Sequence, residues 1–254
     1  MKTIQITATA LIVILMGCSK TNFNSAPEPA FPISGDASGS KLTMNWIVPE
    51  NFVEEITNQY FPLATGDTHY FHLEAVEYGD TIFEESFIAS TTDVKTILGI
   101  NCKVIHDLVT TDGIVTEYTY DWYVQDILGN VWYFGEDTKK LLDDGTWSTE
   151  GSWEAGVDGA LPGIIMFSNP ADYIGKKVYQ ELYLGQAEDQ AAIVSTNETV
   201  VIDYGTFTGC VKTAEWTVLA PGVIGNKYYA PGIGLVFSET VQGGVEHQEL
   251  VGTN

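Results

Sequence analysis

From about residue 42 onward, short hydrophobic runs alternate with clusters of turn-forming residues. The runs are rich in β-branched and aromatic side chains and are interrupted by Gly, Asp, Asn and Pro, which is typical of β-strands joined by tight turns. We predict strands at residues 69–76, 103–110, 114–124, 130–134, 178–184, 199–202, 211–219 and 233–241. No amphipathic helix of crossover length separates these runs, so the pattern does not favour a parallel sheet.

This pattern predicts an all-β fold in which an antiparallel, curved sheet forms a barrel, a half-barrel or a sandwich. One short N-terminal helix is predicted at residues 51–60, where Phe52, Ile56 and Tyr60 form a modest apolar stripe. Neither a linker nor a repeat of fixed period interrupts residues 42–254. We therefore expect them to form a single all-β domain.

The first 17 residues form a separate hydrophobic segment. After Lys2, a mostly apolar stretch at residues 8–16 has about half of the roughly 20 residues that a membrane-spanning helix needs. Residues 1–17 are therefore predicted to be a signal peptide. The segment ends in Leu15-Met16-Gly17-Cys18, which resembles the lipobox of bacterial lipoproteins: Leu, a variable residue, a small residue and the Cys that receives diacylglycerol.

The lipobox resemblance implies that Cys18 is lipidated and becomes the new N-terminus. Acyl chains contribute about 0.8 kcal/mol for each buried methylene, so several chains on one Cys hold a protein at a membrane. Residues 18–41 are rich in Ser, Pro, Gly and Asn and are expected to be a lipidated, flexible spacer. In many Gram-negative lipoproteins an Asp after the lipidated Cys retains the protein at the inner membrane. Ser19 stands there instead, which favours the outer membrane.

The charge of the chain excludes some classes of partner. The chain has 34 acidic and 11 basic residues, a formal net charge of −23, and every basic residue is Lys. Loss of Lys2 with the leader leaves 34 acids against 10 Lys, or −24. An acidic chain without Arg repels phosphate backbones and cannot make bidentate contacts with them, which excludes nucleic acid as a partner. The protein is therefore expected to be held at the membrane by its lipid and not by basic residues.

After lipidation of Cys18, Cys102 and Cys210 are the remaining thiols. Both lie in strand-like runs and would be in an oxidising compartment, so they form either one disulfide or two buried free thiols. Neither lies in a CxxC motif or beside a His, which argues against redox or metal chemistry.

Residues 143–163 form the segment least like a strand. It combines five Gly with two Trp and five acids, namely Asp143, Asp144, Trp147, Glu150, Trp153, Glu154 and Asp158. Carboxylates and Gly-rich turns could supply oxygen ligands to Ca²⁺, although no EF-hand loop is present. Trp faces beside acids also suit glycan binding or hydrolysis. The third interpretation is structural, with the Trp rings capping the sheet and the acids solvated.

A second group of candidate residues lies in the strand predicted at 114–124. Alternate residues of a strand share a face, so one face carries a polar ladder of Glu117, Thr119, Asp121, Tyr123 and Gln125. If this ladder faces the interior of a curved sheet, it lines a cavity with two carboxylates, Glu117 and Asp121. If it faces water, it is the solvated side of the sheet.

The body of the chain also shows a resemblance. The motifs are YFPL at 60–63, DWYVQD at 121–126, GNVWYFGEDT at 129–138, GSWEAGVDGA at 151–160 and KYYAPGIGLV at 227–236. Their order resembles a group of secreted or lipid-anchored bacterial all-β proteins of no established activity. The last motif is also similar to the half-barrels of periplasmic lipoprotein carriers. The resemblance implies an all-β fold and an envelope location.

Together these observations predict a lipid-anchored protein of the bacterial cell envelope that is not an enzyme and binds a ligand, a cation or a partner protein. No GxSxG elbow, P-loop or GxGxxG motif is present, and no cofactor is expected apart from the Ca²⁺ hypothesis. The alternative is a protein that binds or hydrolyses glycans through residues 143–163. The candidate partners are a glycan, a small apolar ligand or another envelope protein.

Overall fold

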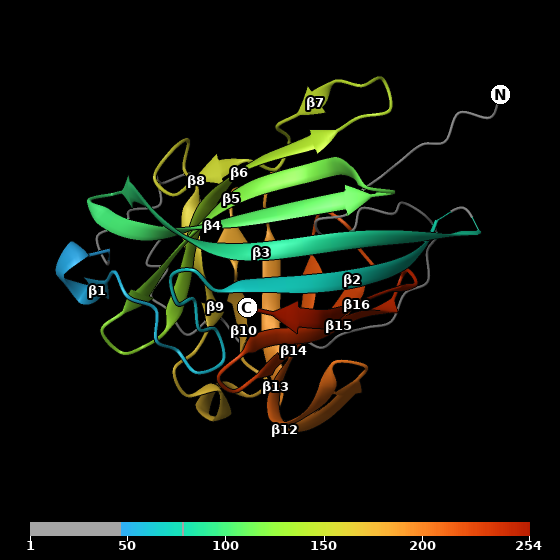
Figure 1. The fold of residues 1–254 in the computed structure, drawn as a ribbon. Helices are drawn as coiled ribbons and strands as arrows, with labels where there is room; N and C mark the ends of the chain where they lie inside the picture. Colours follow the sequence, from blue (N-terminus) through green and yellow to red (C-terminus); the bar gives the residue numbers. More distant parts are fainter. Residues whose placement is uncertain (1–46, 78) are drawn as a thin grey trace.

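The structure is a computed structural model that describes residues 47–77 and 79–254. It is an antiparallel β-sheet that curls into a nearly closed barrel (Figure 1). The 3₁₀-helices are η1 (Pro49–Asn51) and η2 (Pro170–Tyr173). The strands are β1 (Phe52–Val53), β2 (Thr68–Glu77), β3 (Asp80–Ile97), β4 (Ile100–Thr111), β5 (Ile114–Asp126), β6 (Val131–Leu141), β7 (Trp147–Ser148), β8 (Trp153–Glu154), β9 (Leu161–Met166), β10 (Lys177–Tyr179), β11 (Glu181–Leu182), β12 (Asp189–Ile202), β13 (Gly205–Thr217), β14 (Ile224–Ala230), β15 (Gly234–Gln242) and β16 (Glu246–Thr253).

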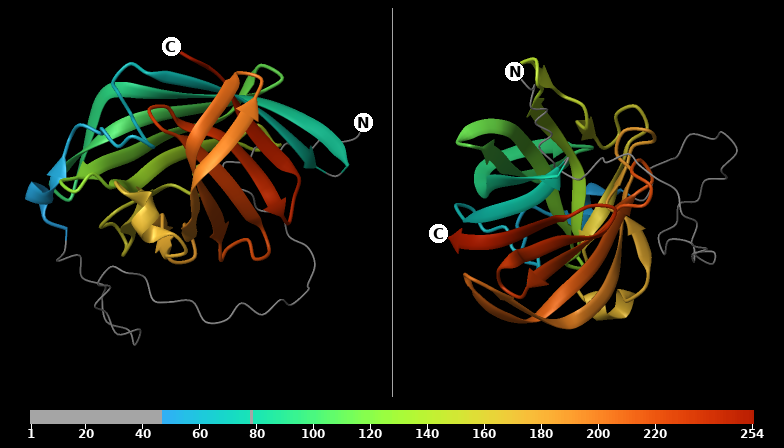
Figure 2. Two further views of the ribbon diagram at one scale, coloured as in Figure 1. Left: turned by 90° about the horizontal axis from the view of Figure 1, so that it is seen from below. Right: turned by 90° about the vertical axis from the view of Figure 1, so that its right-hand side faces the viewer.

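The long strands pair mostly with their neighbours in sequence. The order is β10-β12-β13-β14-β15-β16-β2-β3-β4-β5-β6-β9-β11, and β1, β7 and β8 add short pairings to β5 and β6. The pairing of β16 with β2 joins the C-terminal strand to the first long strand, with Leu250 opposite Phe71. This long-range pairing brings the two halves of the chain into one sheet, and the views in Figure 2 show the strands curling around a common interior.

The two ends of the strand order meet at Gln180. This residue links β10, at one end, to β11, at the other, and its amide donates a hydrogen bond to the carbonyl of Asp189 at 2.8 Å. Gly163 on β9 permits the approach, because a Cβ there would lie 2.3 Å from the carbonyl carbon of Gln180. The covalent chain therefore completes the wall where the hydrogen-bonded ladder ends.

The all-β prediction is confirmed, but the helix predicted at residues 51–60 is wrong. Helix η1 is a single turn that ends at Asn51, and Phe52–Val53 pairs with β5 as strand β1. Phe52 packs edge-on against Trp132 and Phe134, with ring centroids 6.3 and 5.6 Å apart. These long-range contacts outweigh the weak local preference for a helix.

The predicted strands are found, with different lengths. The run at 178–184 is divided between β10 and β11, and the runs at 130–134 and 199–202 are the ends of longer strands. The predicted ranges do not include the long strands β3, β14 and β16 or the shorter strands β1, β7, β8 and β9. The predicted signal peptide, Cys18 and the spacer lie outside the described residues. Within residues 47–77 and 79–254, no helix is long and apolar enough to cross a membrane.

The two Cys residues are both free and buried. Cys102 belongs to the large hydrophobic core around Val124 and Phe134, whereas Cys210 belongs to a separate cluster with Phe71 and Leu250. This arrangement corresponds to the second of the two alternatives from the sequence, two buried free thiols. Burial raises the pKa of Cys102 to about 12, so this thiol is held in its unreactive form.

Candidate functional site

The polar ladder of β5 faces the interior of the barrel. Glu117, Thr119 and Gln125 retain only 3%, 5% and 7% of their accessible surface. The hydroxyls of Thr119 and Thr138 are 2.8 Å apart across the β5–β6 ladder. The alternation of polar and apolar residues along β5 therefore places the polar side chains on the inward face of the strand.

Further acids extend this polar face around the barrel. We call the following six residues the lumen acids: Asp107 on β4, Asp121 on β5, Glu136 on β6, Glu181 on β11, Asp189 on β12 and Glu215 on β13. Asp121 lies directly opposite Glu136 in the β5–β6 register. The charges of neighbouring acids act on each other, since Asp107 raises the pKa of Asp121 and Glu181 raises that of Glu136. The lumen acids therefore form one electrostatic cluster assembled from six strands.

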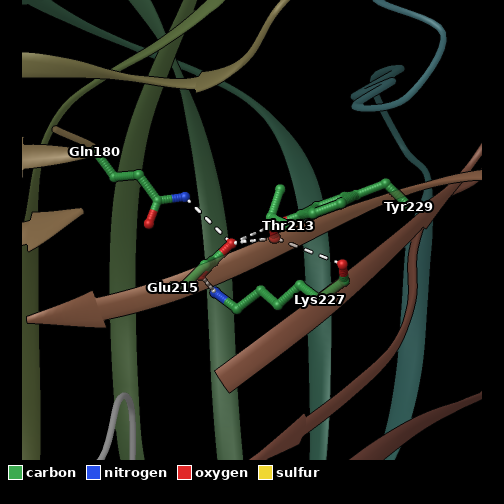
Figure 3. A network of polar contacts seen from close by, with 5 residues as sticks. All are labelled: Gln180, Thr213, Glu215, Lys227 and Tyr229. Carbon is green, nitrogen blue, oxygen red and sulfur yellow. Dashed lines mark hydrogen bonds and ion pairs between the residues drawn. The ribbon is translucent and has the colours of Figure 1, made fainter. Parts of the chain in front are cut away.

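Lys227 on β14 supplies positive charge to this cluster. Its Nζ lies 2.9 Å from Oε2 of Glu215, a side chain with 4% exposure. Oε1 of Glu215 accepts hydrogen bonds from Thr213 Oγ1 at 2.8 Å, Gln180 Nε2 at 3.3 Å and Tyr229 OH at 3.4 Å (Figure 3). The ion pair and these three donors fix the Glu215 carboxylate in place.

Desolvation is the main cause of the pKa shifts of Asp107, Asp121 and Asp189. Burial raises the pKa of Asp107 to about 6, although the Ser86 hydroxyl and Lys227 oppose the rise. Burial, and next the charge of Asp107, raise the pKa of Asp121 to about 7, despite a hydrogen bond from the Tyr133 hydroxyl at 2.5 Å. Burial also raises the pKa of Asp189 to about 6. These carboxyls therefore titrate near neutral pH.

Two further lumen acids, Glu136 and Glu181, have still stronger shifts. Burial, followed by the charge of Glu181, raises the pKa of Glu136 well above its ordinary value. Burial, followed by the charge of Asp189, does the same for Glu181. Repulsion between like charges therefore adds to desolvation at four of these carboxyls, those of Asp121, Glu136, Glu181 and Asp189.

The interior of the barrel is not completely filled by side chains. Asp107, Asp121, Glu136, Glu181 and Asp189 are enclosed by the barrel, yet each keeps an intermediate exposure and is not fully buried. A cavity of about 60 Å³ adjoins the Glu215–Lys227 pair, with Asn226, Ser238 and Thr240 among its lining residues. This volume is room for more than one water molecule. Of the lumen acids, Glu215 lines this cavity.

Aromatic rings lie beside the acids. Tyr123 and Tyr133 stack with centroids 4.7 Å apart, and Trp153 meets Tyr133 edge-on at 5.4 Å. Trp153 on β8 is paired with Glu136, and only 4% of it is exposed. Its indole Nε1 has no partner that meets hydrogen-bond geometry, although it lies close enough to Glu181 to lower the pKa of that carboxyl. The polar space is thus bordered by aromatic faces and by a buried N–H donor.

Residues 143–163 do not assemble into one site. Asp143, Asp144, Glu150 and Asp158 are exposed, and Trp147 on β7 is 43% exposed and packs on Tyr118 at 5.3 Å. Glu154 forms a 3.0 Å ion pair with Lys95. Of the candidates in this segment, Trp153 is the one that lies beside a lumen acid.

Calcium binding remains a prediction. Across residues 47–77 and 79–254, no three His, Cys, Asp or Glu side chains are placed to hold a metal ion together. The lumen acids come from six different strands, and no three of them are placed close enough together to share one metal ion. Ca²⁺ takes six to eight oxygen ligands around one centre, and these side chains do not provide such a set.

The pKa shifts predict that the protein is more stable at about pH 5 than at about pH 8. A carboxyl with a raised pKa holds its proton more tightly in the folded state, so its contribution is fully present below about pH 4 and is lost as the pH rises through 6 to 7. Asp107 and Asp121 together should contribute about 2–4 kcal/mol after allowance for water in the lumen. The melting temperature should then fall by about 5–10 °C between these pH values, as measured by calorimetry.

Two variants provide the controls for this pH dependence. Asp121→Asn should flatten the curve, because it removes one of the titrating groups and relieves its neighbours. Asp203→Asn changes an exposed acid in the turn between β12 and β13 and should leave the curve as it is in the wild type. A melting temperature that rises from pH 5 to pH 8 would show that the lumen acids are not desolvated as described.

Comparisons with known proteins add a distant structural likeness. The chain matches no protein-family model, and no curated protein matches it in sequence. It is similar to a "putative exported protein with YmcC-like fold" from Bacteroides fragilis, with 16% identity and a TM-score of 0.45, over 78% of this chain and 99% of that one. It is also similar to a "putative lipoprotein" from Parabacteroides distasonis, with 15% identity, a TM-score of 0.45 and the same coverage. These scores are too low to transfer a site or a function.

Proposed function

We propose that this chain is a lipid-anchored protein of the bacterial cell envelope that binds a small polar ligand inside its barrel and catalyses no reaction. The lipobox at Leu15–Cys18 supports the anchor, and Ser19 supports the outer membrane as its location. The observation that carries the ligand proposal is the set of lumen acids around the barrel interior, where a cavity of about 60 Å³ adjoins Glu215 and Lys227. Buried charges without enough partners are costly, and a bound ligand could offset that cost.

The arrangement of Glu215 supports binding over catalysis. Three hydrogen-bond donors and the Lys227 ammonium hold this carboxylate. A group held in this way is suited to a fixed electrostatic role and poorly suited to moving a proton during a reaction. Trp153 offers the opposite situation, since its indole N–H is buried without a well-formed partner and can serve an acceptor on a ligand.

Native mass spectrometry of the protein purified from membranes in mild detergent tests the ligand proposal. We expect a co-purifying small molecule on the wild-type protein that is lost from Glu136→Gln. Glu150→Gln, which makes the same change at an exposed position, should retain it. If the wild type carries no adduct, or if Glu136→Gln carries the same one, the interior is not the binding site.

The anchor gives a separate prediction. Cys18→Ser removes the thiol to which diacylglycerol would be attached, so the protein should move from the membrane fraction to the soluble envelope fraction. Intact-mass measurement should show that the acyl chains are missing. Cys102→Ser is the matched control, because it changes a thiol inside the folded domain, and it should stay in the membrane fraction. If Cys18→Ser remains membrane-bound with an unchanged mass, the lipoprotein assignment is incorrect.

Glycan binding is the second candidate, and the aromatic wall of Tyr133 and Trp153 favours it. Sugar rings stack on aromatic faces, and their hydroxyls hydrogen-bond to carboxylates and indole N–H groups. Titration of the intrinsic Trp fluorescence with neutral oligosaccharides tests this candidate. A saturable change that disappears when Trp153 is replaced by Phe would support it, and a flat response across several oligosaccharide classes would count against it.

A further inference from the structure

When they are ionised, the six lumen acids carry more negative charge than the single ammonium group of Lys227 neutralises. Six lumen acids face a space to which Lys227 contributes one positive charge, and Lys227 is already within 2.9 Å of Glu215. Lys227 acts on Asp107, Asp121 and Asp189 as well, but at longer range. One ammonium group cannot balance carboxylates that are distributed over six strands.

The imbalance is greatest on the side formed by β5, β6 and β11. Asp121 and Glu136 are directly opposite on neighbouring strands, and each has the Tyr133 hydroxyl as a polar neighbour. Glu181 acts electrostatically on Glu136. The pKa values of these three carboxyls are raised partly by each other, which is the expected sign of an unmatched cluster of like charges.

The groups beside these three acids indicate which kind of ligand could neutralise their charge. The stacked rings of Tyr123 and Tyr133 and the edge-on Trp153 provide aromatic surface, which attracts organic cations. The buried N–H of Trp153 lies near Glu181 without a well-formed hydrogen bond, so it can donate to an acceptor on a ligand, which a simple ammonium or metal ion lacks. No three potential metal ligands in the described part of the chain converge.

We propose that the barrel interior binds a small organic ammonium compound that also carries hydroxyl groups, such as an amino sugar or an amino alcohol. The ammonium group lies among Asp121, Glu136 and Glu181, and a hydroxyl oxygen accepts the Trp153 N–H. This inference rests on the proposed function, because it names the chemical class of the ligand for the same interior site. It requires no change in covalent bonds.

The test is a calorimetric titration of the detergent-purified, lipidated protein with matched probes at about pH 7.5. Glucosamine is compared with N-acetylglucosamine and glucose, which keep the ring but lack the ammonium charge. Ethanolamine is compared with ethylene glycol in the same way. We expect each amine to bind at least about tenfold more tightly than its neutral counterparts, a ratio that corresponds to about 1.4 kcal/mol.

Amine binding by variants, and by the wild type at two pH values, tests whether the lumen acids form the binding site. Asp121→Asn and Glu136→Gln should each weaken amine binding by about tenfold, and Glu150→Gln should keep it within about twofold. Amine binding by the wild type should also weaken between about pH 7.5 and pH 5, because protonation of the lumen acids removes the charge that attracts the ammonium. This second measurement needs no variant, so it stands even if a substitution prevents folding.

The outcomes separate this inference from the proposed function. If N-acetylglucosamine or glucose binds as tightly as glucosamine, the amine proposal is overturned, although ligand binding inside the barrel stands. If no amine binds more tightly than its neutral counterpart but a co-purified adduct depends on Glu136, the amine proposal also fails alone. If neither an adduct nor amine binding is found, both proposals fail.

Discussion

Replacing Lys227 with Met should lower the free energy of unfolding by about 3–5 kcal/mol, the cost found when one partner of a buried ion pair is removed. The substitution preserves most of the side-chain volume, so lost packing contributes little. Its main effect is to leave Glu215, with 4% exposure, without its counter-ion at 2.9 Å. The three hydrogen-bond donors to Glu215 would remain but would carry no full positive charge.

Urea unfolding at about pH 7.5 measures this loss of stability. Two further variants test whether the loss comes from the uncompensated charge of Glu215. Lys176→Met changes an exposed Lys that lies over the Tyr173 ring and should cost less than about 0.5 kcal/mol. Adding Glu215→Gln to Lys227→Met should recover most of the lost stability, because the uncompensated charge is then removed. A loss below about 1 kcal/mol for Lys227→Met would mean that Glu215 is better solvated than the structure indicates.

Gly163→Ala should lower the free energy of unfolding by about 3 kcal/mol or more, through a clash with backbone atoms. A Cβ at residue 163 would lie 2.3 Å from the carbonyl carbon of Gln180 and 2.4 Å from the carbonyl oxygens of Gln180 and Tyr179. Backbone atoms cannot turn away as a flexible side chain can. Strand β9 must therefore separate from the segment that closes the barrel.

Gly205→Ala is the matched control for this substitution. It adds the same methyl group at the start of β13, where the nearest atom is Phe207 Cζ at an ordinary contact distance of 3.7 Å. We expect a change within about 0.5 kcal/mol in its urea unfolding curve. If Gly163→Ala is as stable as Gly205→Ala, the closure at Gln180 is looser than described.

The strand pattern and the candidate ladder were accessible from the sequence because both depend on local alternation. Residues 117–125 alternate polar and apolar side chains, which identifies the two faces of a strand. Alternation alone cannot show which face is inside, since a solvated face and a polar lumen have the same pattern. That question is answered by the pairing of β16 with β2, which involves residues far apart in sequence.

The other lumen acids could not have been identified from the sequence for the same reason. Glu181, Asp189 and Glu215 are ordinary acids in or beside short strands until the curl of the sheet places them around one interior. A weak signal was present at residues 213–217, where Thr213, Glu215 and Thr217 repeat the polar alternation of β5. The predicted helix was wrong because contacts of Phe52 with distant aromatic rings decide that segment.

The segment at 143–163 shows the limit of reasoning from composition. Its acids and Trp residues are close in sequence, but most of the acids lie on exposed turns, and Trp147 and Trp153 have very different exposure. Composition included Trp153, which borders the lumen, among seven candidates in this segment. It could not distinguish this residue from its neighbours, because burial depends on the pairing of β8 with β6.

The central claim is that the lumen acids form a single buried cluster, and a carboxyl-detected ¹³C NMR titration of the ligand-free protein tests it most directly. The structure predicts that Asp107 and Asp189 titrate near about pH 6 and Asp121 near about pH 7. In Asp121→Asn, the pKa of Glu136 should fall, because a repelling neighbour is gone. Titration of all these carboxyls near pH 4, unaffected by Asp121→Asn, would contradict the account.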